Sequence, residues 1–384
     1  MEDIIDNRMK VLFWVGYRFE KWDSKSNGLG GTETAVVNIA ESLVRHGVEV
    51  VCAGEVFSSN GSLINGVAWE NTEEFKDKYK GLPENHFDAV IGVNYLHFVQ
   101  VLKEVNLKPT VTMFWVHNTD YHEYYEHKEL EDQEGLFHEI DWIMAPTQWA
   151  IKEFKRLNLD NFKKPWNGML ASLNNGVNLD NFNANVAKDP NKFIWSSAID
   201  RGLTDLLENW WKVKQIKPEA TLDVYYPKYS DPHVIDDRNW HNMGGVLDKL
   251  EELKSLGVTD MGSCSHEELY IAMQKASYWM YLTRYEETFC ITALEMQAAG
   301  VLCIVSDTAA LPYVVQDGII VPTTEDETMF NNAIQLLSMT DSGIIEKATR
   351  DGKEKVKTRF TWDAQGHSWY QVLSNYIKEK QNEN

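Results

Sequence analysis

Two glutamates, Glu287 and Glu295, stand with seven residues between them in the segment YLTRYEETFCITALEMQAAG, residues 281–300. The apolar residues up to Leu282 predict a strand, and the pattern from about residues 289–291 onward predicts a helix. The first N–H groups of a helix lack intrahelical partners and carry partial positive charge, so they suit an anion such as a diphosphate. A carboxylate one to two turns into the helix, as Glu295 would be, can accept hydrogen bonds from a ribose diol. The alternative is that both acids only stabilise the helix dipole.

A strand, a glycine-rich loop, a helix and a second strand are predicted at the start of the chain. The apolar run at residues 9–16 predicts a buried strand, and the loop follows at residues 27–31. Thr32 is expected to cap a helix from Glu33 to His46. A strand at residues 48–53 completes the unit, and such units form parallel sheets.

The same alternation restarts after residues 181–191, whose lack of periodicity predicts a linker. A strand at residues 192–198 and a helix from Gly202 to Lys214 open the second series. Ligands of doubly wound sheets bind beyond the C-terminal ends of the strands, so a site in the cleft between two such domains is expected. The expected α/β organisation has Rossmann-like domains at residues 1–182 and 183–360, and a helix at residues 361–384 that packs back on the first domain.

The composition narrows the function classes. The chain has 384 residues and a formal net charge of −21, which disfavours a nucleic-acid partner and a surface held on anionic lipid. The four cysteines form no C-x-x-C pair, and residues 1–10 lack the apolar core of a secretory signal. No segment is apolar enough to span a membrane. A soluble cytoplasmic protein is expected.

The segment from Glu287 onward resembles the nucleotide-sugar-binding core of retaining glycosyltransferases with the GT-B fold. In particular, it resembles glycosyltransferase family 4, the glycosyl transferases group 1. The resemblance rests on Glu287 and Glu295 together with the following Ala-Gly300, Val-Ser306-Asp and Leu-Pro312. The segment NGVNLDNF at residues 175–182 resembles the family's junction between domains.

The resemblance implies a role for each matching residue of the second domain. Glu287 would face the donor sugar, and Glu295 would bind the ribose hydroxyls. Arg201 would pair with the phosphates, because a guanidinium can bind two oxygens at once. The diphosphate would be held by the backbone N–H groups of four consecutive residues, Thr288, Phe289, Cys290 and Ile291.

In the first domain, the resemblance covers Gly30, Gly31 and His117. The two glycines match the family's glycine-rich loop, where the absent side chains would let the backbone approach the donor. His117 matches the family's histidine beside the donor sugar and would hydrogen-bond to a sugar hydroxyl.

The sequence departs from the family pattern at Ser196, where many members carry Arg, and at Cys290, which often is Gly. The phosphate charge would therefore rest on Arg201 and the helix, or on another cation such as Arg18 or Arg284. Cys290 is tolerable if only its N–H is used, but its side chain could instead narrow the pocket.

The resemblance implies transfer of a sugar from a nucleoside diphosphate sugar, a UDP- or GDP-sugar first of all, to a hydroxyl of a glycan or glycoconjugate. It implies retention at the anomeric carbon, no metal and no cofactor. Front-face attack and a covalent intermediate both remain open. So do two alternatives, a GT-B sugar-nucleotide epimerase and a non-catalytic nucleotide-sugar-binding module.

Overall fold

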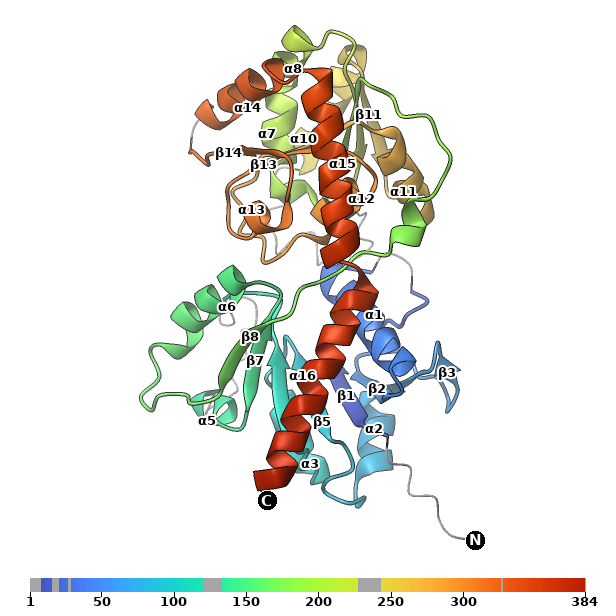
Figure 1. Cartoon of the computed structure of the whole chain (residues 1–384), viewed down its shortest axis with the longest axis vertical. Helices are drawn as coiled ribbons and strands as arrows, with labels where there is room; N and C mark the ends of the chain where they lie inside the picture. Colours follow the sequence, from blue (N-terminus) through green and yellow to red (C-terminus); the bar gives the residue numbers. More distant parts are fainter. Residues whose placement is uncertain are drawn as a thin grey trace. The chain divides into compact units, whose positions relative to one another are not determined.

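The computed structural model describes residues 8–15, 21–26, 29–120, 133–226, 243–325 and 327–383. The chain divides into two compact units. Unit 1 comprises Met1–Gly176 together with Trp362–Asn384, and unit 2 comprises Val177–Thr361. Both contain a parallel sheet covered by helices, which confirms the predicted α/β fold (Figure 1). No described helix is long and apolar enough to cross a membrane.

The sheet of unit 1 has the strand order β3-β4-β2-β1-β5-β6-β7-β8. All its pairs are parallel except β3 with β4. The strands are β1 (Lys10–Val15), β2 (Glu49–Gly54), β3 (Leu63–Ile64), β4 (Val67–Asn71), β5 (Ala89–Val93), β6 (Val111–Trp115), β7 (Trp142–Ala145) and β8 (Met169–Ser172). The helices are α1 (Gly31–Arg45), α2 (Thr72–Tyr79), α3 (Phe98–Val105), α5 (Gln133–Phe137), α6 (Gln148–Phe154), the π-helical turn η1 (Lys155–Leu159) and α16 (Trp362–Glu383).

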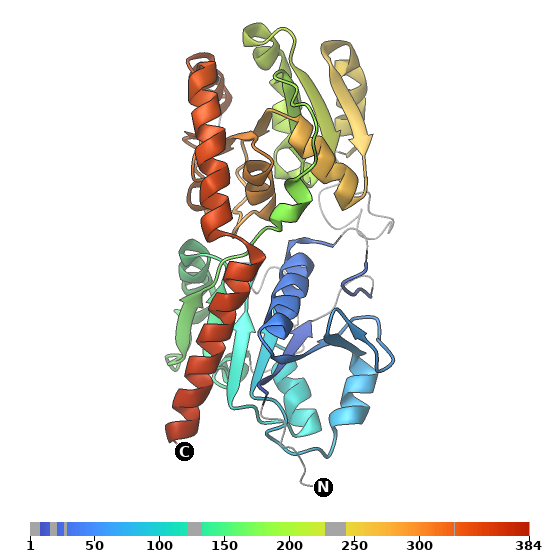
Figure 2. The same ribbon diagram turned by 45° about the vertical axis from the view of Figure 1, so that its right-hand side comes forward.

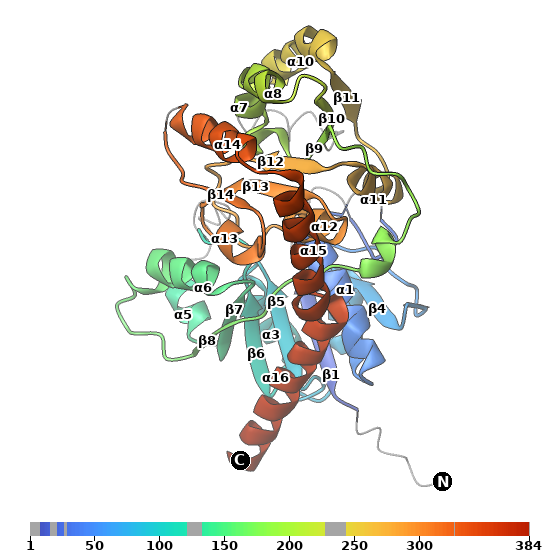
Figure 3. The same ribbon diagram turned by 45° about the horizontal axis from the view of Figure 1, so that its top comes forward.

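The sheet of unit 2 has the order β11-β10-β9-β12-β13-β14, and its pairs are parallel (Figure 3). The strands are β9 (Lys192–Ser196), β10 (Thr221–Tyr225), β11 (Val258–Gly262), β12 (Tyr278–Tyr281), β13 (Leu302–Ser306) and β14 (Ile319–Val321). The α-helices are α7 (Leu203–Glu208), α8 (Trp210–Ile216), α10 (Met243–Glu252), α11 (His266–Lys275), α12 (Ile291–Ala298), α13 (Leu311–Val314), α14 (Thr328–Ser338) and α15 (Ser342–Arg359). Short 3-10 turns lie at η2 (Leu179–Phe182), η3 (Ile199–Arg201) and η5 (Leu253–Leu256).

Two predicted helix details are wrong. Helix α1 begins at Gly31 with Gly30 as its N-cap, so Thr32 already lies inside the helix and cannot cap it. Gly30 has the extended backbone that an N-cap needs, and its carbonyl accepts the first helical bond, from the N–H of Thr34 at 2.9 Å. The helix predicted from Gly202 to Lys214 breaks at Asn209, whose side-chain amide donates to the carbonyl of Asp205 at 2.9 Å. A side chain that bonds to the backbone in this way competes with the helical ladder.

Helix α16 packs against α1 and the sheet of unit 1 (Figure 2). Trp369 is fully buried there, with its ring 4.8 Å from that of Trp115 and 6.2 Å from that of Phe13. The close approach of the two helices depends on Gly366, because a Cβ at that position would lie 1.9 Å from Oγ of Ser42. A glycine inside a helix costs about 1 kcal/mol relative to alanine, and here it removes a steric clash.

The replacement Gly366→Ala should destabilise unit 1 by about 1–3 kcal/mol, because Ser42 and α1 must move to admit the methyl group. The control is Gly352→Ala in α15, where a Cβ would lie at an ordinary 3.5 Å from Oε1 of Gln297. That variant should gain up to about 1 kcal/mol from helix propensity. Differential scanning calorimetry measures both variants. Equal effects of the two substitutions would contradict the packing explanation.

Candidate active site

Arg201 and Glu287 come together because β9 and β12 are neighbours in the sheet of unit 2. Arg201 lies in η3, directly after β9, and Glu287 lies in the loop after β12. The segments that follow two neighbouring parallel strands both begin at the carboxyl ends of those strands, and so they lie close together. Nη1 of Arg201 lies 3.9 Å from Oε1 of Glu287, so the two predicted residues share one site.

The Glu287 carboxylate is held in place by neighbouring groups. The hydroxyl of Tyr281 donates to Oε1 of Glu287 at 2.6 Å. The backbone is fixed as well, because the N–H of Glu287 donates to the carbonyl of Tyr285 at 2.9 Å and the N–H of Ala310 donates to the carbonyl of Glu287 at 3.1 Å. Burial raises the pKa of Glu287, and the hydrogen bond from Tyr281 and the charge of Arg201 offset only part of this rise.

The Arg201 guanidinium stacks on an aromatic ring. Its Cζ lies 3.1 Å from the centroid of the Tyr285 ring, within the range of a cation–π contact. The side chain is 22% exposed, and Nε lies 3.4 Å from Oδ1 of Asp200. Nε is buried and has no hydrogen-bond acceptor among the described residues. The guanidinium therefore has at least one N–H group, on Nε, that no described residue accepts.

Helix α12 begins at Ile291, so Thr288 and Phe289 belong to the loop before it and Cys290 is the N-cap. Phe289 is buried in the core of unit 2, which anchors the loop. Cys290 has φ +72°, the left-handed conformation that normally favours glycine. Burial and the charges of Glu287 and Glu295 raise the pKa of the Cys290 thiol well above its usual value. The side chain at this position is therefore an uncharged thiol at neutral pH.

Glu295 lies at the start of the second turn of α12 and contacts a tyrosine from a different helix. The hydroxyl of Tyr270, in α11, hydrogen-bonds to the Glu295 carboxylate. Burial raises the pKa of Glu295 to about 7, although the Tyr270 bond acts in the opposite direction. Glu295 is thus a hydrogen-bond acceptor whose ionisation changes near neutral pH.

The other predicted site residues, Gly30, Gly31 and His117, lie in unit 1. Gly30 and Gly31 start α1, which follows β1. Neither glycine has a positive φ, and a Cβ on Gly31 would meet no atom within 4 Å. Packing within the described structure therefore does not explain why Gly31 lacks a side chain.

His117 follows β6 and is 8% exposed. Its backbone N–H donates to Oδ1 of Asn94 at 2.7 Å, and its ring centroid lies 4.5 Å from that of Trp115. Burial lowers the pKa of His117 to about 3, so the imidazole is neutral at physiological pH. It can take part in hydrogen bonds but does not supply a positive charge.

The two alternative cations differ in their surroundings. Nη1 of Arg284 donates to Asp205 at 2.7 Å, and its Nε donates to the carbonyl of Thr324 at 3.0 Å. Both of these Arg284 groups therefore already donate within the protein, whereas Nε of Arg201 has no acceptor among the described residues. Arg18 lies outside the described residues.

Three tyrosines of the site were not predicted from the sequence. Tyr281 ends a strand, Tyr285 lies in a loop and Tyr270 lies in a separate helix. The only sequence signal was for Tyr285, which stands two residues before Glu287. Contacts of Tyr281 and Tyr270 arise from loop geometry and helix packing, which periodicity does not specify.

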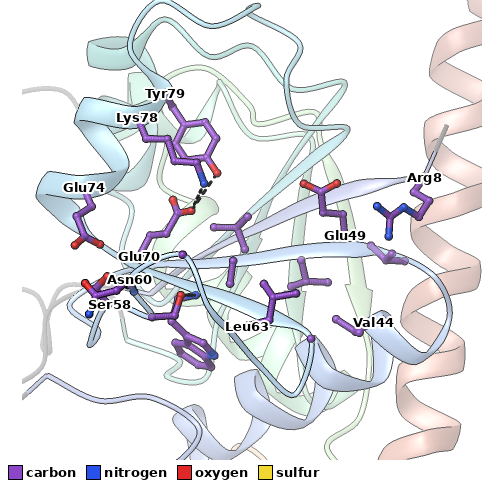
Figure 4. A pocket seen from close by; sticks show the side chains of 18 of the residues that line it. Arg8, Val44, Glu49, Ser58, Asn60, Leu63, Glu70, Glu74, Lys78 and Tyr79 are labelled. Carbon is purple, nitrogen blue, oxygen red and sulfur yellow. Dashed lines mark hydrogen bonds and ion pairs between the residues drawn. The ribbon is translucent and has the colours of Figure 1, made fainter. Parts of the chain in front are cut away.

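A separate cavity of about 1050 Å³ lies in unit 1 beside β2, β4 and α2 (Figure 4). Glu70 points toward Lys78 there, and Nζ of Lys78 donates to Oε1 of Glu70 at 2.5 Å. The hydroxyl of Tyr79 reaches the same oxygen at 3.4 Å. None of the predicted site residues lines this cavity.

Comparisons with known proteins bear on the family and on the fold. Residues 243–355, which include Glu287 and Glu295, match the family described as "Glycosyl transferases group 1". No curated protein matches the chain by sequence. Solved structures share the fold. Sucrose-phosphate synthase from Thermosynechococcus elongatus has a TM-score of 0.74 at 17% identity, covering 97% of this chain and 100% of that one.

Two further structures are similar over nearly the whole chain. Anabaena HepE in complex with UDP-glucose has a TM-score of 0.69 at 13% identity, covering 96% of this chain and 100% of that one. The α,α-trehalose 6-phosphate synthase from Burkholderia multivorans has a TM-score of 0.70 at 10% identity, covering 97% and 98%. These matches show the GT-B fold, and together with the family match they support a glycosyltransferase.

The left-handed backbone of Cys290 should determine how substitutions at this position change the free energy of unfolding. Cys290→Gly should leave the free energy of unfolding within about 1 kcal/mol of the wild type, because relief of strain offsets the greater entropy of the unfolded chain. Cys290→Val should lose about 1–3 kcal/mol, because a β-branched residue tolerates a positive φ poorly. Urea unfolding measures both. Similar stabilities of the two variants would contradict this account.

Proposed function

We propose that the protein is a retaining glycosyltransferase that moves a sugar from a nucleoside diphosphate sugar to a hydroxyl of a glycan or glycoconjugate. The observation that carries the proposal is the Arg201–Glu287 pair beside the N-terminus of α12. It combines an anion-binding cation, a helix start and a fixed carboxylate at one sheet edge. The four cysteines form no disulfide, which suits a reducing compartment, and we place the reaction in the cytoplasm.

The departing nucleoside diphosphate gains negative charge as the bond to the sugar breaks. Arg201 and the backbone N–H groups from Thr288 to Ile291 would stabilise that charge, because these donors are already oriented and need not reorganise during the reaction. We propose that this stabilisation operates without a metal. Glu295 would accept hydrogen bonds from the ribose hydroxyls of the donor. The roles of Gly30, Gly31 and His117 at the sugar are part of the same proposal.

Glu287 is suited to stabilise positive charge on the sugar ring. The hydroxyl of Tyr281 fixes its Oε1, so the carboxylate keeps one orientation while the donor changes charge. Retention follows either from front-face attack, assisted by the leaving phosphate, or from a covalent intermediate. The present geometry is compatible with both routes.

UDP-sugars are the first donors to test, because HepE has been crystallised with UDP and with UDP-glucose. Thermal-shift measurements with UDP-, GDP-, ADP- and dTDP-sugars would identify the donor without knowledge of the acceptor. Transfer to candidate glycans is then measured with the donor that binds.

Glu287→Gln should lower the rate of transfer at least about 100-fold, because an electrostatic group at the reacting sugar is lost. The matched control is Glu286→Ala, which removes the exposed neighbouring acid and should keep the wild-type rate. Wild-type turnover in Glu287→Gln would refute the assignment. Nucleotide release without an acceptor, with inversion at C2 of the sugar, would instead indicate an epimerase. Donor binding without turnover on any glycan would indicate a binding module.

Affinity for UDP-glucose, measured by calorimetry, should depend on pH through Glu295. Ionised Glu295 accepts the ribose hydroxyl bonds, and its pKa is about 7. Affinity should therefore fall about 10-fold from about pH 8 to pH 6 as the carboxylate is protonated. The diphosphate of UDP-glucose remains ionised over this range, so its charge does not contribute.

The variant Glu295→Gln is the control for this titration. It cannot ionise and should bind UDP-glucose more weakly, with an affinity that no longer changes with pH. A flat profile in the wild type would show that Glu295 does not titrate in the site.

A further inference from the structure

Tyr285 is fixed by the same turn that positions Glu287. Its carbonyl accepts the N–H of Glu287 at 2.9 Å, and its own N–H donates to Oγ1 of Thr283 at 3.0 Å. The ring lies against the Arg201 guanidinium, with Cζ 3.1 Å from the ring centroid. The loop after β12 therefore supplies both the acid of the site and the surface on which the cation rests.

Directional bonds to carboxylates do not hold Arg201 in this position. The nearest carboxylate oxygens, on Asp200 and Glu287, lie 3.4 Å and 3.9 Å away. These distances exceed those of a strong charge-assisted hydrogen bond, about 2.7–2.9 Å. The aromatic stack, at 3.1 Å, is thus the closest of these three contacts of the guanidinium.

Stacking leaves the guanidinium able to bind an anion. A contact to the ring uses the flat face of the group, whereas its N–H donors point outward in the plane. A carboxylate partner in bidentate contact would occupy two of those donors. Tyr285 therefore restrains Arg201 without using the donors that a diphosphate needs.

The restraint also has an energetic consequence. A free arginine side chain samples many rotamers, and part of this freedom is lost when the guanidinium binds a phosphate. A side chain already held in one orientation loses less on binding, so affinity rises.

We propose that Tyr285 is a positioning residue that holds the Arg201 guanidinium flat, with its N–H edge directed at the diphosphate of the donor. This inference rests on the proposed function and adds to it the residue that keeps the phosphate-binding cation in place. Tyr285 acts through Arg201 and need not touch the donor itself.

A double-mutant cycle tests the proposal, with UDP and GDP as probes and calorimetry as the measurement. Tyr285→Leu, which removes the ring, should weaken binding of the preferred nucleotide about 10-fold. Tyr285→Phe, which keeps the ring, should bind within about twofold of the wild type. Tyr285 is partly exposed, so these variants should fold. Tyr285→Gln is a second variant without a ring and should weaken binding as Tyr285→Leu does.

Arg201→Met completes the cycle. The double variant Arg201→Met/Tyr285→Leu should bind no more weakly than Arg201→Met alone, because the ring has no guanidinium left to hold. A purely structural role of Tyr285 would instead give losses that add in the double variant. Additive losses, or an unchanged affinity in Tyr285→Leu, would overturn the proposal for Tyr285. A wild-type protein that binds neither nucleotide would count against the proposed function itself.

Discussion

The site in unit 2 depends on the adjacency of β9 and β12 in one parallel sheet. Every strand of such a sheet ends at the same edge, so the segments that follow neighbouring strands meet there. Arg201 and Glu287 are far apart in the sequence, yet each lies in the segment that follows one of these two strands. The N-terminus of α12 reaches this region because only the loop with Glu287 separates it from β12. A different strand order would separate the cation from the acid and the helix start.

The two glutamates of this site have different surroundings, although they belong to one short motif. Glu287 lies near Arg201 and accepts a hydrogen bond from Tyr281, and both offset part of the rise in its pKa that burial causes. Glu295 has a neutral tyrosine as its partner, and its pKa rises to about 7. These different surroundings suit the separate roles that we propose for the two acids.

The sequence was sufficient to predict the fold class, because alternating apolar strands and amphipathic helices set a two-sheet α/β structure. It was insufficient for several local features. Strands β3 and β4 were not predicted, although Asn65 and Gly66 between them, at φ +51° and +85°, form the two-residue turn of a hairpin. The predicted cap at Thr32 was wrong because a glycine with suitable backbone angles precedes it. The tyrosines around Arg201 and Glu287 were missed because their contacts come from tertiary packing.

The acidity of the chain limits how an anionic donor can be held. Arg201 has the carboxylates of Asp200 and Glu287 within 4 Å, so this cluster has no excess positive charge when both acids are ionised. In the proposed function, binding of a diphosphate would then depend on the geometry of N–H donors more than on net charge. An anion site on a protein of net charge −21 thus requires a cation held in one orientation and backbone amides fixed by the loop, because long-range attraction cannot supply the affinity.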